Sequence, residues 1–217
     1  MPRTKPADQR RADLMAAAQA LFIERGVAAT TLEDVTARAG VSKGLFYEYF
    51  HSKDDLVLAL QEYFAHRLSE RMRHAIAAAA AWPEKLDAGI QACFRGFQAE
   101  HDLHEVLFRH AGHASQSTPA GRAGAAPQRD SSHHLLVETF RTLLDDGVAA
   151  GAFQVEDIHA TALLLACAMH AFDPTFLAPT RDRLSAQRLL YATQVLGRRA
   201  AGIAAPPSPT RPRSRAH

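Results

Sequence analysis

The chain has 217 residues, of which 47% are hydrophobic, so it can bury a substantial core in one or two domains. It is rich in Ala, Leu and Arg and poor in Val, Ile and Thr, a composition that favours helices over sheets. The formal net charge is +2, but residues 198–217 carry five arginines and no acid, which leaves 20 basic and 23 acidic residues, or −3, in the rest. Bulk charge therefore does not predict a nucleic-acid partner. No run of about 18 apolar residues and no signal-peptide pattern is present, so we expect a cytoplasmic protein that does not enter a membrane.

Helical periodicity and end signals divide the first part of the chain into three short helices and one long helix. Side-chain caps predict where each helix begins, and glycines predict where two of them end. The predicted segments are 8–26 ended by Gly26, 31–39 capped by Thr31 with Asp34 and ended by Gly40, 43–50 capped by Ser42, and 53–81 capped by Ser52 with Asp55.

The rest of the chain continues as longer helices, predicted over 84–99, 102–112, 132–149, 157–171 and 182–200. A Pro/Gly/Ala/Ser-rich loop is expected over 115–130. The predicted fold is all-α with about nine helices. We expect a helix-turn-helix domain of three helices (1–53), a helical bundle domain with a dimer interface (54–200) and a disordered basic tail (201–217).

The second and third short helices, joined by Ala39-Gly40-Val41, predict a helix-turn-helix. On the third helix Phe46 and Phe50 share one face and are expected to pack inward. Lys43 and Tyr47 share another face, with Gly44 and Tyr49 close by. This outward face suits a groove of DNA, because a lysine can donate to guanine and a tyrosine can contact phosphate or a thymine methyl. Lys53, in the first turn of the next helix, is expected to help hold a phosphate.

The stretch "GVSKGLFYEYFHSKDDL" resembles the DNA-binding signature of the TetR/AcrR family of bacterial repressors, and the close match covers roughly residues 9–60. The resemblance implies a homodimer that binds a double-stranded DNA operator through a three-helix domain and binds an effector through a larger domain. Leu45 departs from the pattern, because the family often has a small hydroxyl residue there. The candidate DNA-contacting residues are Thr31, Ser42, Lys43, Gly44, Leu45, Tyr47, Tyr49 and Lys53.

The segment "HDLHEVLFRHAGH" (101–113) contains four histidines, which raises the question of a metal site. On a helix, His110 lies on the apolar stripe and His104 is expected to face water, and the two histidine pairs point in different directions. We therefore expect no four-histidine metal site and no cofactor. The predicted effector pocket comprises Phe94, Phe97, Leu103, Leu107, His110, Phe140 and His170.

The sequence contains no nucleophile elbow, phosphate loop, HExxH motif or paired carboxylates in a plausible context, so an enzyme is not expected. The expected function is a ligand-responsive repressor released from its operator by a small, largely apolar effector. A metal- or haem-responsive sensor on the same scaffold is the alternative. The last two helices are expected to form the dimer interface, with Leu164, Leu189 and Val195 buried between two copies.

Overall fold

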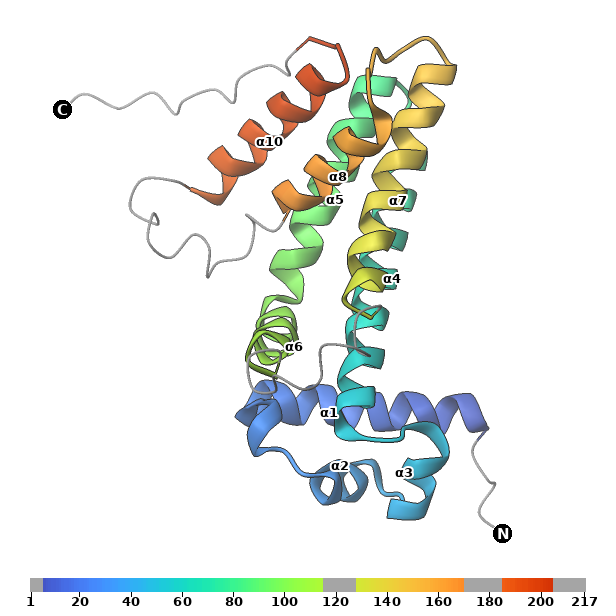
Figure 1. Ribbon diagram of the computed structural model, residues 1–217, viewed down its shortest axis with the longest axis vertical. Coiled ribbons are helices and arrows are strands. Elements are labelled where there is room, and N and C mark those ends of the chain that lie inside the picture. Colours follow the sequence, from blue (N-terminus) through green and yellow to red (C-terminus); the bar gives the residue numbers. More distant parts are fainter. Residues whose placement is uncertain (1–5, 115–127, 170–184, 205–217) are drawn as a thin grey trace, which may run out of the picture. The chain divides into compact units, whose positions relative to one another are not determined.

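The computed structural model describes residues 6–114, 128–169 and 185–204, and over these ranges the chain forms helices and no strand, which confirms the all-α prediction (Figure 1). The nine helices of the described ranges are α1 (Ala7–Ala29), α2 (Leu32–Ala39), α3 (Lys43–Tyr49), α4 (Lys53–Ala78), α5 (Trp82–Ala99), α6 (His101–Ala114), α7 (Gln128–Ala149), α8 (Ile158–Met169) and α10 (Ala186–Ala200).

Several helix ends differ from the predictions by a few residues. Gly26 has φ 83° and interrupts the helix as expected, but helical residues follow it and α1 ends at Ala29. The expected tail is ordered in its first residues, because Ala201 is fully buried and its carbonyl oxygen accepts the backbone N–H of Gln154 at 3.0 Å. Residues 205–217 lie outside the described ranges.

The chain divides into two compact units, the first made of Met1–Arg67 and Glu100–Ser132, the second of Leu68–Ala99 and His133–His217. This division differs from the expected boundary at residue 53, because the first part of α4 and all of α6 belong to the same unit as the three short helices. The reason is packing: Leu103 and Leu107 of α6 are buried in the core that α1 also lines.

The core of the first unit fixes the helix-turn-helix. One buried cluster contains Leu21 of α1, Val35 of α2, Phe46 of α3 and Phe50, which directly follows α3. This confirms the predicted inward face of α3. Four such side chains stabilise the unit by several kcal/mol, since burying one large apolar side chain contributes about 1.5–3 kcal/mol.

In the second unit, α5 packs against α8 and α10. A Cβ at Gly197 would lie 2.9 Å from Ile90 Cδ1, so glycine permits the close approach of α10 to α5. The same two helices are joined by an ion pair of 2.7 Å between Arg198 and Asp87. None of the helices in the described ranges is long and apolar enough to cross a membrane.

Candidate nucleic-acid interface

The helix-turn-helix is held in shape by local hydrogen bonds. The hydroxyl of Thr31 accepts the backbone N–H of Asp34 at 3.1 Å, and the carboxylate of Asp34 accepts the backbone N–H of Thr31 at 3.0 Å, which is the predicted capping box. Gly40 ends α2 in the left-handed region at φ 68°. Ser42 then caps α3 by accepting the N–H of Leu45 at 3.2 Å. Thr31 and Ser42 therefore both serve as N-caps.

The outward side of α3 is exposed as the sequence predicts. Lys43 and Gly44 are exposed, and a Cβ at Gly44 would meet nothing closer than Ser42 Oγ at 3.9 Å. Tyr47 exposes 47% of its surface, although its neighbour Phe46 is fully buried. Tyr49 differs from the expectation, because it is half-buried and packs against the core of the unit. Leu45 is also half-buried.

The amino group of Lys43 is paired within the helix-turn-helix. Its Nζ donates to Oε1 of Glu33 at 2.6 Å, and both side chains are more than half exposed. The hydrogen bond from Lys43 lowers the pKa of Glu33, and the same bond raises the pKa of Lys43. The pair is therefore charged on both sides at neutral pH. Sequence reasoning missed it, because ten residues separate the partners and they lie on different helices.

Lys53 occupies a different environment from the one expected. Its Nζ donates to the carbonyl oxygens of Val27 at 2.9 Å and Thr30 at 3.0 Å, so it ties the start of α4 to the end of α1. An ammonium group has three N–H donors, and these two bonds use two of them. Its role as a phosphate ligand remains a prediction, and the tie between helices is a structural role that the sequence did not indicate.

The structure corrects the prediction for His104. The side chain is 6% exposed rather than in water, and its ring stacks on Phe108 at a centroid distance of 4.4 Å and lies 5.4 Å from the ring of Phe64. Periodicity along α6 could not reveal this, because Phe64 comes from α4. His110 lies in α6, but its side chain and all of His170 fall outside the described residues.

The predicted effector pocket is divided between the two units. Leu103 and Leu107 are core residues of the first unit. Phe94, Phe97 and Phe140 belong to the second unit, in which Phe97 and Phe140 are buried. Two hollows among the described residues are lined by other side chains.

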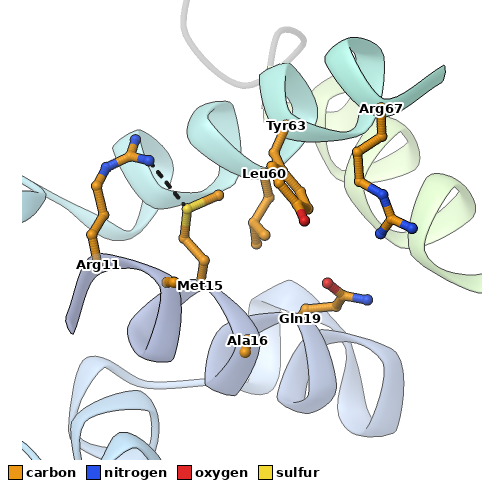
Figure 2. A pocket seen from close by; sticks show the side chains of 8 residues that line it. Arg11, Met15, Ala16, Gln19, Leu60, Tyr63 and Arg67 are labelled. Carbon is orange, nitrogen blue, oxygen red and sulfur yellow. Dashed lines mark hydrogen bonds between the residues drawn. The ribbon is translucent and has the colours of Figure 1, made fainter. Parts of the chain in front are cut away.

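The hollow in the first unit lies between α1 and α4 and has a volume of about 290 Å³ (Figure 2). Figure 2 shows Arg11 near one end and Arg67 near the other, with Leu60 and Met15 between them. The hollow in the second unit has a volume of about 420 Å³, and its lining includes Arg73 of α4, Trp82 of α5 and Glu138 of α7. Among the described side chains no three His, Cys, Asp or Glu residues gather as a metal site would require.

The second unit exposes several leucines. Leu164 is 69% exposed and Leu163 is 41% exposed on α8, and Leu196 is 55% exposed on α10. Cys167, one turn after these leucines of α8, is also exposed. Leu189 and Val195, the other predicted interface residues, are half-buried.

The chain is similar in sequence to known proteins. The family model described as bacterial regulatory proteins, tetR family, matches residues 14–60. The HTH-type transcriptional repressor KstR2 of Mycolicibacterium smegmatis is 31% identical over 159 residues, which are 70% of this chain and 70% of that protein. The HTH-type transcriptional activator FasR of the same species is 31% identical over 103 residues, or 48% of this chain and 47% of FasR, so the match spans about half of that relative.

Solved structures show the same fold. FadR of Bacillus subtilis, determined in complex with stearoyl-CoA, has a TM-score of 0.65 and 20% identity over 89% of this chain and 99% of that one. The fold of this structure thus matches over nearly the whole length, whereas the family model matches residues 14–60, which include the helix-turn-helix.

Proposed function

Because the chain belongs to the tetR family of bacterial regulatory proteins, a family of transcription regulators rather than enzymes, we propose that it is a ligand-responsive repressor. As a homodimer it binds a double-stranded DNA operator, and it leaves the operator when a small, largely apolar effector binds. A dimer that reads two major grooves must hold its two copies of α3 about 34–36 Å apart. An effector that prefers another spacing would shift the population away from the DNA-bound form.

One observation carries the DNA-binding part: α3 buries Phe46 and leaves the ring of Tyr47 in water beside Lys43. A large exposed aromatic ring next to a lysine near the start of the second helix of a helix-turn-helix is placed to contact base edges and phosphates. We propose DNA contacts from the full predicted set, namely Thr31, Ser42, Lys43, Gly44, Leu45, Tyr47, Tyr49 and Lys53. Lys53 would donate to a phosphate through the one N–H that is not hydrogen-bonded to the carbonyl oxygens of Val27 and Thr30.

The exposed leucines of the second unit support the homodimer. Leu163 and Leu164 leave a large apolar area of α8 in contact with solvent in a single chain. Such an area is characteristic of an interface, and a two-fold axis would let the same patch cover its own copy.

The effector is proposed to be small and largely apolar, and to bind in the second unit. FadR, which shares the fold, was solved with stearoyl-CoA, a ligand whose stearoyl chain is apolar. We keep Phe94, Phe97 and Phe140 as candidate lining residues and His170 as a candidate polar contact, whereas His110 belongs to the first unit and stays a prediction from the sequence. The metal- or haem-responsive alternative rests on the twelve histidines of the chain, and no contact among the described residues favours it.

The test uses the full chain and a pool of random 30-base-pair duplexes. We expect the wild-type protein to select a motif with two related half-sites, and Tyr47→Ala to lose binding to it by about 100-fold or more with an unchanged circular dichroism spectrum. Tyr63→Ala is the matched control, because Tyr63 is also 47% exposed but lies on α4. If the wild type selects no motif, the proposed function is wrong. If the wild type selects a motif and both variants bind it equally well, Tyr47 is not a DNA contact.

A further inference from the structure

Glu33 and Lys43 place a hydrogen-bond acceptor and a donor side by side on the face that we assign to DNA. Glu33 comes from the first turn of α2 and Lys43 is the first residue of α3, and their Oε1 and Nζ atoms are 2.6 Å apart. Both side chains point into solvent, with 66% and 54% of their surfaces exposed. In the free protein the pair is neutral overall, so it offers little attraction to the phosphate backbone.

The major-groove edge of a G·C base pair presents the complementary pattern. Guanine offers O6 and N7 as acceptors, and cytosine offers the N4 amino group as a donor. Guanine O6 and cytosine N4 are themselves hydrogen-bonded to each other, so they lie about 2.9 Å apart. A lysine donor and a carboxylate acceptor at 2.6 Å therefore match these two neighbouring atoms in both chemistry and spacing.

We propose that Glu33 and Lys43 read one G·C base pair together, which makes Glu33 a specificity-determining residue. This inference rests on the proposed DNA-binding function. Lys43 donates to guanine O6 and N7, and Glu33 accepts the outward N–H of cytosine N4. The carboxylate also keeps the lysine near the base edges. If Lys43 left Glu33 to bind a phosphate, the negative charge of Glu33 would lie unpaired beside the negatively charged backbone of the DNA.

The electrostatics distinguish this pair from an ordinary surface ion pair. Exposed ion pairs contribute little to stability, so stability does not account for the placement of a carboxylate on a DNA-reading face. A carboxylate there is repelled by phosphates unless it has a donor to bind, and of the four bases cytosine is the one that glutamate and aspartate are best placed to read. The expected gain is discrimination between sequences rather than tighter binding to all DNA.

The chain supplies a matched control in a second exposed ion pair. Glu24 of α1 accepts a 2.7 Å contact from Arg38, and both of these side chains are 40% or more exposed. Glu24→Ala and Glu33→Ala remove the same negative charge from the same unit, so they change its net charge equally. Glu33→Ala alone removes the acceptor beside Lys43.

The experiment repeats the random-duplex selection with wild type, Glu33→Ala, Lys43→Ala and Glu24→Ala, all as full chains with circular dichroism and thermal unfolding as checks on folding. We expect a G·C pair in the wild-type motif, preferred about tenfold or more over other pairs, whose preference falls to about threefold or less in Glu33→Ala and in Lys43→Ala at the same position. Glu24→Ala should keep the wild-type preference.

A loss of preference at different positions in the two variants would overturn the shared reading of one base pair. Equal motifs from Glu33→Ala and Glu24→Ala would also overturn it, because the effect of Glu33 would then be charge alone. Both outcomes leave the proposed function standing, since the wild type would still select a motif. A wild type that selects no motif overturns the proposed function and this inference with it.

Discussion

The outward side of α3 and the exposed leucines of α8 and α10 are both open to solvent in the single chain, but they expose different chemistry. The first presents Lys43 with its partner Glu33 and the ring of Tyr47. The second presents aliphatic side chains, of which Leu164 is the most exposed. Polar groups that already bind water or an ion-pair partner gain binding free energy only from a partner whose donors and acceptors match theirs. Leucines gain binding free energy from any apolar surface that excludes water from them. The comparison indicates a directional partner for α3 and an apolar partner for α8 and α10.

The largest expected effect comes from a charge placed among the leucines. Leu164→Glu should raise the dimer dissociation constant by about 100-fold or more, because association would bury an unpaired carboxylate. Sedimentation velocity at micromolar concentration should then show a monomer. Operator binding should also weaken in this variant, since a monomer can bind only one half-site.

Ile23→Glu is the control for that change. Ile23 of α1 is 41% exposed, as Leu163 is, but belongs to the first unit. We expect this variant to remain a dimer. A dimeric Leu164→Glu, or a monomeric Ile23→Glu, would place the interface elsewhere and would remove the contrast between the two regions.

The next effect separates local from tertiary constraints on glycine. Gly147→Ala in the second unit would drive its Cβ into the buried ring of Phe153, and overpacking of this kind costs about 1–3 kcal/mol. Gly40→Ala in the first unit meets nothing within 4 Å, so its cost is the left-handed backbone at φ 68° alone, about 1 kcal/mol. Urea unfolding at one fixed protein concentration should show the larger loss of unfolding free energy for Gly147→Ala. The opposite order would mean that the Phe153 ring moves aside.

The same contrast explains what the sequence could predict. The helix-turn-helix was predicted correctly because its signals lie within a few residues of one another: Thr31 caps with Asp34, Gly40 ends α2, and Ser42 caps α3. These are short-range preferences that the chain carries in its local order.

The errors concern contacts between distant segments. His104 is buried because Phe64, forty residues earlier, lies against it, and periodicity on α6 contains no information about α4. Leu103 and Leu107 were predicted in an effector pocket but lie in the core with α1. The Glu33–Lys43 pair was missed for the same reason, since each residue looks like an ordinary surface charge on its own helix.

The smallest effect is a change in the reaction rate of a cysteine beside the exposed leucines of α8, and it requires no change of fold. The chain has two cysteines, and they differ in environment. Cys93 is fully buried on α5, and burial raises the pKa of its thiol, so it should react with an aromatic disulfide reagent after unfolding and not before.

Cys167 is exposed on α8, three residues after Leu164 and four after Leu163, so it lies on the side of the helix that carries the exposed leucines. A dimer formed through those leucines should shield Cys167, and the Leu164→Glu monomer should expose it. We expect Cys167 to react several-fold faster in Leu164→Glu than in wild type, with Ile23→Glu at the wild-type rate. Equal rates in all three proteins, together with a monomeric Leu164→Glu, would show that the interface uses Leu164 from a direction that leaves the cysteine side of α8 in solvent.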